Sequence, residues 1–325
     1  LRLRKLYNKG MENVYVIVGF LLAAYSVIAN DSVQTLGTWI ASNSKKFKWY
    51  YMWGAASSVL LFTIWYGWSV NGGDISYGRL DKIPYQTVQW YHALAPMILV
   101  ALTRFGVPVS TTFLVLSAFA STLVLEKVLV KSAMGYVVAA SAAYVIWLGV
   151  SKYWENKKDV APERETAWRC AQWLTTGWLW FTWLSHDMAN IAVFLPREIP
   201  VITMILISLV FVIGLGFMFF EKGGKIQKIV LSKANVNYVR SATIVDLVYS
   251  LILWYFKSYN SIPMSTTWVF VGLLAGRELA FVTTKSLGDS HNMKIVFPML
   301  LKDFLKMMVG LAISVAMVLA IHFLF

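Results

Sequence analysis

Long apolar stretches separated by short polar connections run along the whole chain. Stretches of about 17 to 25 apolar residues are long enough to cross the hydrocarbon core of a bilayer. The clearest runs are Val14–Ile28, Met52–Val70, Ala93–Leu102, Thr111–Leu125, Met134–Val150, Trp168–Leu184, Ile202–Phe220, Thr243–Phe256, Trp268–Thr283 and Val309–Phe325. This pattern predicts an all-α polytopic membrane protein with roughly 10–12 membrane segments.

Composition agrees with a membrane location. The chain is 58% hydrophobic and 14% charged, whereas soluble domains are about 25% charged. The net charge of +13 arises largely in short connections such as 43–48 and 221–228. Lys and Arg placed there anchor and orient helices at a phospholipid surface, and no nucleic-acid recognition module accompanies them. We expect an integral protein of the plasma (inner) membrane if the source is prokaryotic, with its N-terminal apolar run retained as a helix.

Two pairs of motifs repeat at nearly the same offset. VPVSTT at Val107–Thr112 is answered by IPMSTT at Ile262–Thr267, with the serines at positions 110 and 265. Asn30-Asp31 is answered by His186-Asp187, again about half the chain later. Such internal symmetry is typical of secondary transporters built from two related repeats. We expect a first transmembrane repeat over 1–151, a polar linker over 152–169 and a second repeat over 170–325.

Each STT hexapeptide combines a proline, a serine and two threonines ahead of an apolar stretch. Proline suits the approach to a helix, and serine supplies an oxygen that caps its N-terminus. The unpaired N–H groups of the first turn attract anions, and a broken helix brings such a terminus to the membrane midplane. The expected anion donors are Ser110, Thr111, Thr112, Ser265, Thr266 and Thr267. The alternative is that each hexapeptide only caps an ordinary membrane helix.

Two carboxylates stand at the ends of apolar stretches. Asp31 is followed by Gln34 and other small or polar residues, and Asp187 is followed by Asn190. Intramembrane carboxylates usually mark ion or substrate pathways, and this composition is typical of a broken or re-entrant segment that lines a cavity. The alternative is a pair of interfacial loop residues or N-caps.

Asp246 is a third acidic candidate within an apolar stretch, 19 positions before Ser265. The corresponding position before Ser110 is Tyr91, beside His92. We therefore expect a site that is not fully symmetric.

The order of these motifs resembles that of the PiT family of inorganic phosphate transporters, which have one GANDVANA-like and one P-x-STT-like element in each half. GGKIQKIV at Gly223–Val230 is similar to the glycine-lysine segment of that family, and the resemblance covers nearly the whole chain. The acidic motifs depart from the family pattern. Ile28 stands where the family has glycine, Gln34 where it has asparagine, and His186 where asparagine is usual.

The resemblance implies two inverted-topology repeats with phosphate bound between the acidic motifs and the STT termini, accompanied by sodium ions. Sodium is expected at Asp31 and Asp187, with His186 and Asp246 as further cation-coupling candidates. A protonated His186 would couple transport to protons instead, and a packed structural histidine is the alternative. Carried over position by position, the substrate-binding residues are Asn30, Asp31, Gln34, Ser110, Thr111, Thr112, Asp187, Asn190, Ser265, Thr266 and Thr267. No cofactor other than a coupling ion is expected, and a homodimer is the candidate assembly.

Functions of other classes fit the residues less well. The four histidines are scattered along the chain, and no HExxH motif or cysteine pair supplies metal ligands, so an enzyme is not expected. An anion channel would not require two matched anion sites. Sulfate is fully deprotonated at neutral pH, whereas phosphate keeps a proton that Asp31 or Asp187 can accept. The sequence therefore favours phosphate, with sulfate or another oxyanion, and proton coupling, as alternatives.

Overall fold

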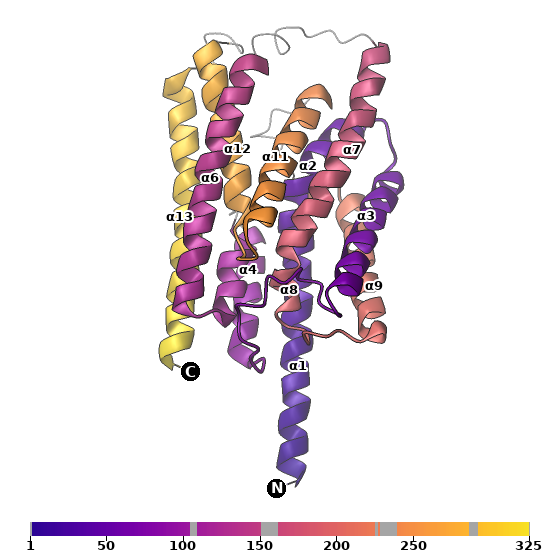
Figure 1. Cartoon of the computed structure of the whole chain (residues 1–325), viewed down its shortest axis with the longest axis vertical. Helices are drawn as coiled ribbons and strands as arrows, with labels where there is room; N and C mark the ends of the chain where they lie inside the picture. The colour runs from indigo at the N-terminus through magenta and orange to yellow at the C-terminus, as the bar shows by residue number, and fades with distance from the viewer. Residues whose placement is uncertain are drawn as a thin grey trace.

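The computed structural model describes residues 2–104, 109–150, 162–224, 227, 239–285 and 292–324, and the regular elements in these ranges are helices (Figure 1). The first half holds α1 (Arg2–Ser26), the π-helical turn η1 (Val27–Asp31), α2 (Ser32–Asn43), α3 (Trp49–Val70), the 3₁₀ turn η2 (Trp90–Ala93), α4 (Leu94–Arg104), α5 (Thr111–Leu114), the 3₁₀ turn η3 (Leu116–Phe119) and α6 (Thr122–Val150). The second half holds α7 (Pro162–Asp187), α8 (Ala189–Ala192), α9 (Val201–Phe220), α11 (Val239–Tyr259), α12 (Thr266–Thr284) and α13 (Met293–Leu324). The predicted all-α polytopic class is confirmed.

The helices that carry the two acidic motifs run in opposite directions. In Figure 1, α1, η1 and α2 rise from the bottom to the top of the molecule, whereas α7 descends from the top to α8. The connection between α11 and α12 lies in the middle of the molecule, and α4 occupies the lower half beneath it. This arrangement is expected of inverted repeats whose broken helices meet near the midplane.

The second STT helix, α12, packs closely along α6. A Cβ atom added at Gly272 would collide with the carbonyl oxygen of Tyr136, and one at Gly276 with that of Ala140. Glycines four residues apart therefore let the two backbones touch, the arrangement by which small residues join helices in lipid. This contact fixes the position of α12 and of the STT motif at its N-terminus.

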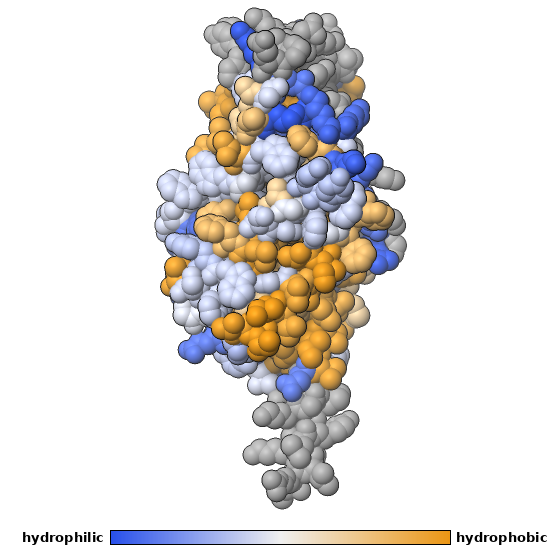
Figure 2. All heavy atoms as spheres, turned by 90° about the vertical axis from the view of Figure 1, so that its right-hand side faces the viewer, coloured by the Kyte–Doolittle hydropathy of each residue, from blue (hydrophilic) through white to orange (hydrophobic). Residues whose placement is uncertain are grey.

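The outer surface suits a lipid environment. Figure 2 shows the side of the molecule at the right of Figure 1, where apolar surface lies between hydrophilic residues gathered toward the two ends. On α9 the exposed side chains include Ile202, Leu206, Ile213 and Phe217. Large aliphatic side chains exposed along a helix are expected where lipid replaces water.

Five segments among the described residues are both long and apolar enough to cross a membrane by length and composition: Asn13–Asn43, Thr122–Val150, Val201–Phe220, Val239–Tyr259 and Met293–Ile321. Other long helices carry polar or tryptophan- and tyrosine-rich sequences that lower their hydropathy, as in α3 and α7. Broken segments such as α4, α5 and α8 are too short to be counted in this way.

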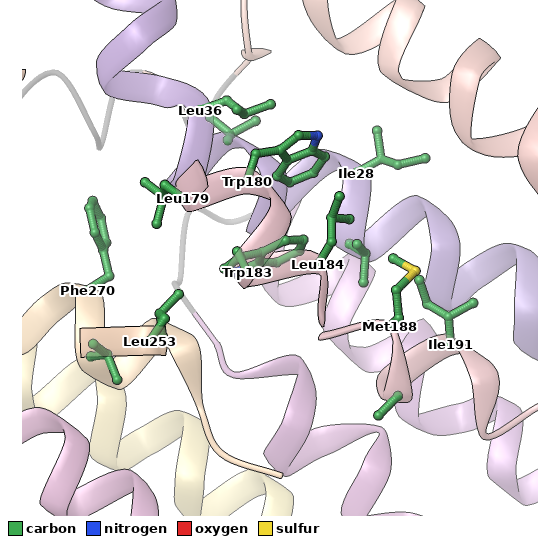
Figure 3. Close-up of a cluster of buried hydrophobic side chains, with 14 of the residues drawn as sticks. Ile28, Leu36, Leu179, Trp180, Trp183, Leu184, Met188, Ile191, Leu253 and Phe270 are labelled. Carbon is green, nitrogen blue, oxygen red and sulfur yellow. The ribbon is translucent and has the colours of Figure 1, made fainter. Parts of the chain in front are cut away.

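A hydrophobic cluster includes residues on either side of both acidic motifs, such as Ile28 and Leu36 in the first half and Leu184 and Met188 in the second (Figure 3). The labelled residues come from η1, α2, α7, α8, α11, α12 and the residue between α7 and α8, and the rings of Trp180 and Trp183 stack with centroids 5.1 Å apart. The labelled members are Ile28, Leu36, Leu179, Trp180, Trp183, Leu184, Met188, Ile191, Leu253 and Phe270. Packing of this kind keeps water and lipid away from the polar side chains between the helices.

The first STT motif does not open the long helix that the apolar run Thr111–Leu125 predicts. The α-helix after Ser110 ends at Leu114 and passes through η3, and the next helix, α6, begins at Thr122. The carbonyl of Phe119 accepts a hydrogen bond from Gln86 Nε2 at 3.2 Å, and the hydroxyl of Ser121 accepts one from the backbone N–H of Val124 at 3.4 Å. Side-chain partners thus satisfy backbone groups at the break, where a helical ladder would otherwise do so.

Parts of three predictions lie outside the described residues. These are residues 151–161 of the linker, most of 225–230 in the glycine-lysine segment, and residues 107–108 of the first STT hexapeptide. The division of the chain into 1–151, 152–169 and 170–325 stays a prediction.

Candidate functional site

The first acidic motif lies on a π-helical turn within an otherwise continuous helix. The backbone N–H of Ser32 bonds to the carbonyl of Val27, five residues earlier, and so does the Ser32 hydroxyl at 3.0 Å. The wider turn inserts one residue into the helical register. It directs Asn30 and Asp31, which are 0% and 3% exposed, into the interior.

Asp31 is held by polar partners on both sides. Its Oδ1 accepts a hydrogen bond from Asn30 Nδ2 at 2.6 Å, and its Oδ2 accepts one from the hydroxyl of Thr111. Asn30 also donates to the carbonyl of Val109 at 3.2 Å and accepts from Gln34 Nε2 at 3.1 Å. The first acidic motif therefore meets the first STT motif directly, and Gln34 reaches this cluster through Asn30.

The second acidic motif lies where α7 ends. One residue, Met188, separates α7 from the short α8, and Asp187 and Asn190 stand on either side of this break. Asp187 Oδ1 accepts from Asn190 Nδ2 at 2.8 Å, and Asp187 Oδ2 accepts from the hydroxyl of Thr266 at 2.7 Å. The second half thus repeats the pairing of the first, an acidic-motif carboxylate with the first threonine of an STT motif.

The two STT serines cap their helices in the same way. The hydroxyl oxygen of Ser110 accepts from the backbone N–H of Phe113, and that of Ser265 from Trp268, both at 3.3 Å. A hydroxyl that accepts one hydrogen bond still has its own proton to donate. Capping and anion binding are therefore compatible at both serines. Thr267 is buried one position beyond Thr266.

Thr112 links the two halves. Its hydroxyl lies 3.5 Å from Asp187 Oδ1 and 3.2 Å from the carbonyl oxygen of Met264. Asp31 and Asp187 also interact electrostatically across the same space. The structure thus brings together the acidic and STT motifs of both halves.

Asp246 lies apart from this cluster in its contacts. Its two carboxylate oxygens accept hydrogen bonds from the hydroxyls of Thr38, at 2.7 Å, and Thr176, at 2.6 Å. These residues stand on α2, α7 and α11, so Asp246 joins helices of both halves. Its hydrogen bonds are to these two threonines and not to the STT motifs, and its role in cation coupling stays a prediction.

His186 also turns away from the acidic and STT residues. Its Nε2 lies 2.8 Å from the carbonyl oxygen of Leu253, which requires that nitrogen to carry the proton. Its Nδ1 is buried and has no hydrogen-bond partner among the described residues. These contacts are those of a neutral ring that ties α7 to α11.

Sequence reasoning missed several polar groups around the site. Trp183 Nε1 donates to the hydroxyl of Thr266 at 3.2 Å, and the Tyr249 hydroxyl donates to its carbonyl at 2.9 Å. Arg79, from the connection between α3 and η2, donates from Nε to the carbonyl of Ser185 at 2.9 Å. The aromatic residues lie in apolar runs that predict only packing. A single arginine in a loop gives no sequence signal of its burial.

One buried acceptor in the site has no donor. The amide oxygen of Asn190 makes no hydrogen bond with the described residues, although its nitrogen is bonded to Asp187. A buried polar atom without a partner calls for an explanation such as a bound ion. Carboxylate and amide oxygens are the donors that hard cations prefer. Asp187 and Asn190 are thus suited to hold a small cation, and the STT hydroxyls and helix N-termini an anion.

A solved structure described as the sodium-dependent phosphate transporter matches this chain over 97% of its length and over 100% of the other chain. The TM-score is 0.58 and the sequence identity is 18%. A scan against protein-family models and a search of curated proteins found no match. The likeness confirms the predicted fold, which this chain shares with that structure along nearly its whole length.

Proposed function

We propose that this protein is a secondary active transporter of inorganic phosphate, coupled to sodium, rather than an enzyme or a channel. Alternating access would take place around the site between the two halves. The observation that carries this proposal is the repeated pairing of an STT hydroxyl with a buried carboxylate, at Thr111 and Asp31 and at Thr266 and Asp187. The name of the structural neighbour supports the same substrate and ion.

The pairing supplies a physical reason for coupling. Each threonine hydroxyl has one proton, which it can give either to a carboxylate or to a bound oxyanion. A sodium ion on the carboxylates would offset their negative charge, and rotation of each hydroxyl would then direct its proton to phosphate. Bound cation and bound anion would also neutralise each other in a site where an isolated charge is costly.

Phosphate fits this site better than sulfate does. The hydroxyl and backbone N–H donors of the STT motifs suit any tetrahedral oxyanion. A protonated phosphate can in addition donate to Asp31 or Asp187, whereas sulfate would face a carboxylate with no proton to share. Sulfate transport is the second candidate, because the donor set alone does not distinguish the two anions.

The proposal is tested with purified protein in liposomes. Labelled phosphate and labelled sulfate are offered separately under an inward sodium gradient, an inward proton gradient or neither. We expect phosphate to accumulate above its external concentration only when sodium is the driving ion. Accumulation of sulfate in place of phosphate would reassign the substrate. Accumulation driven by the proton gradient would reassign the coupling ion. A flux that only equalises the anion concentration across the membrane would indicate a channel.

A further inference from the structure

Three basic side chains gather beside the C-terminal end of α7, on three different elements. Arg79 comes from the connection 71–89, Lys131 from α6 and Lys257 from α11. Arg79 interacts electrostatically with both lysines, so the three lie close together. We call Arg79, Lys131 and Lys257 the cation cluster. Arg79 is 2% exposed and Lys131 4% exposed, which is unusual for charged residues.

The cluster adjoins the proposed transport site. Arg79 Nε donates to the carbonyl of Ser185 at 2.9 Å, and Lys257 Nζ donates to the hydroxyl of the same residue at 3.3 Å. Asp187 follows two positions later, and it interacts electrostatically with Arg79. Lys131 Nζ donates at 2.6 Å to the carbonyl of Ile262, in the second STT hexapeptide.

The loop that supplies Arg79 has a defined local structure. The carboxylate of Asp74 accepts from the backbone N–H of Ser76 at 2.7 Å, from its hydroxyl at 2.6 Å and from the N–H of Gly78 at 3.1 Å. The carbonyl of Gly73 accepts from the N–H of Ile199 at 3.1 Å, which attaches this loop to the segment before α9. The position of Arg79 in the interior is therefore built by the surrounding loop.

The three cations of the cluster make no close ion pair with the acids described, although Asp187 attracts Arg79 at longer range. Among the described residues, no carboxylate forms an ion pair with any of the three. Lys131 is fully engaged by the carbonyl oxygens of Asn260 and Ile262 and by the amide oxygen of Asn260. Arg79 Nη1, in contrast, is buried without a hydrogen-bond partner in this part of the chain. Burial of a guanidinium nitrogen without a hydrogen-bond partner costs free energy, and pairing with an anion offsets this cost.

Lys257 is placed to act with Arg79. Its Nζ lies 4.9 Å from the ring centroid of Tyr77, in the same loop as Arg79, and 4.7 Å from that of Phe181 on α7. Aromatic faces hold an ammonium group without using its hydrogen-bond donors. Among the described residues its ammonium donates to the Ser185 hydroxyl at 3.3 Å, which leaves further N–H donors for a ligand.

We propose that the cation cluster is a second oxyanion position, next to the central site, through which phosphate passes between the solution on the side of the 71–89 loop and the STT motifs. Arg79 and Lys257 bind the anion, and Lys131 adds positive charge while holding the tip between α11 and α12. Basic residues in a low-dielectric cleft concentrate anions and raise their rate of association. The passage of phosphate through the cluster rests on the proposed function. The binding of an anion at the cluster does not rest on it.

The test compares Arg79→Gln and Lys257→Gln with the charge-retaining Arg79→Lys and with Lys302→Gln, which removes an exposed charge on α13. Initial uptake of labelled phosphate is measured in liposomes. We expect kcat/KM to fall about tenfold or more in the two glutamine variants, with a smaller change in kcat, and the ionic-strength dependence of kcat/KM to flatten. Arg79→Lys should recover part of the loss, and Lys302→Gln should match the wild type.

Direct binding of labelled phosphate to purified protein gives a second readout. We expect the wild type to bind an additional anion that Arg79→Gln lacks, while the central site remains occupied. Unchanged kcat/KM and unchanged binding in folded Arg79→Gln and Lys257→Gln would overturn the cluster while leaving the proposed function intact. Arg79-dependent phosphate binding in a protein that does not accumulate phosphate would reject the proposed function and retain the cluster.

A phospholipid headgroup offers the same phosphate chemistry as the free anion. The uptake measurements are therefore repeated in liposomes of phosphatidylcholine alone and in liposomes containing phosphatidylglycerol. An equal loss of kcat/KM in both compositions supports a free oxyanion at the cluster. A loss confined to the anionic liposomes would assign the cluster to lipid and overturn the proposal.

Discussion

Thr112 and Asp187 connect the two halves of the molecule at the centre of the site, with the threonine hydroxyl 3.5 Å from carboxylate Oδ1. Thr112 belongs to the first STT motif and Asp187 to the second acidic motif. A movement that opens one side of the site must change this distance, because the two residues stand on elements of different halves. A substrate that contacts both Thr112 and Asp187 would interact with both halves at the same time.

Asp31→Asn and Asp187→Asn are expected to abolish nearly all sodium-driven phosphate uptake while the protein stays folded. The amide keeps the shape of the carboxylate but carries no charge to hold a cation. Its N–H₂ group would also face one of the donors from which the carboxylate accepts, either an asparagine amide or a threonine hydroxyl. Uptake in liposomes is compared with the melting temperature of each variant. Strong sodium-dependent accumulation by both variants would show that neither carboxylate holds the coupling ion.

The two STT serines allow capping to be separated from anion binding. Ser110→Ala and Ser265→Ala should each weaken phosphate affinity by about 1–3 kcal/mol if the hydroxyl also donates to the anion. Replacement by glycine provides the matched control, because glycine is nearly as good an N-cap as serine but has no hydroxyl. Equal losses of affinity in the alanine and glycine variants are expected. If the alanine variants lose stability but all four alanine and glycine variants keep the wild-type phosphate affinity, the two serines act only as helix caps.

Asp246→Asn should reduce phosphate uptake less than Asp31→Asn or Asp187→Asn does. The carboxylate accepts from both Thr38 and Thr176, and an amide can accept from only one of them. The other hydroxyl would lose its acceptor, at a cost of about 1–3 kcal/mol in stability. Thermal unfolding should therefore shift while sodium-driven uptake persists. Loss of uptake as complete as in Asp187→Asn, without a change in melting temperature, would place Asp246 in cation coupling.

His186→Asn tests proton coupling. The hydrogen bond from Nε2 to the Leu253 carbonyl requires a proton on that nitrogen, and the positive charges of the cation cluster oppose protonation of the other ring nitrogen. We therefore expect the wild type and His186→Asn to show the same pH profile of uptake between about pH 6 and 8. Both profiles are corrected for the ionisation of phosphate. The comparison is made at fixed sodium concentration. A flatter profile in the variant would mean that His186 takes up a proton during transport.

The membrane class and the central residues of the site could be predicted from the chain alone. Apolar runs identify helices because lipid requires them to be long and uncharged, and the duplicated motifs point to Asp31, Thr111, Asp187 and Thr266. That the acidic motifs meet the STT motifs is implied by the resemblance to the PiT family. The structure adds the particular partners, with the first threonine of each STT motif donating to a carboxylate.

Other features depend on contacts that leave no periodic signal. The π-helical turn at Val27–Asp31 begins at the end of the apolar run Val14–Ile28, with no glycine or proline to mark it. The early end of α5 at Leu114 depends on local backbone and side-chain partners. Arg79 is buried because a turn organised by Asp74 carries it inward. Such placement results from tertiary packing, which the hydrophobic pattern of the sequence does not encode.

If sodium on the carboxylates releases the STT hydroxyls for phosphate, the binding of the two ions must be linked. The most direct measurement is the equilibrium affinity of purified protein for labelled phosphate, with and without sodium at constant ionic strength. We expect sodium to tighten phosphate binding, and phosphate to tighten sodium binding by the same factor, as linkage requires. The factor should fall to about one in Asp31→Asn and Asp187→Asn if the carboxylates hold the ion. Phosphate affinity that does not respond to sodium in the wild type would contradict coupling of the two ions at this site.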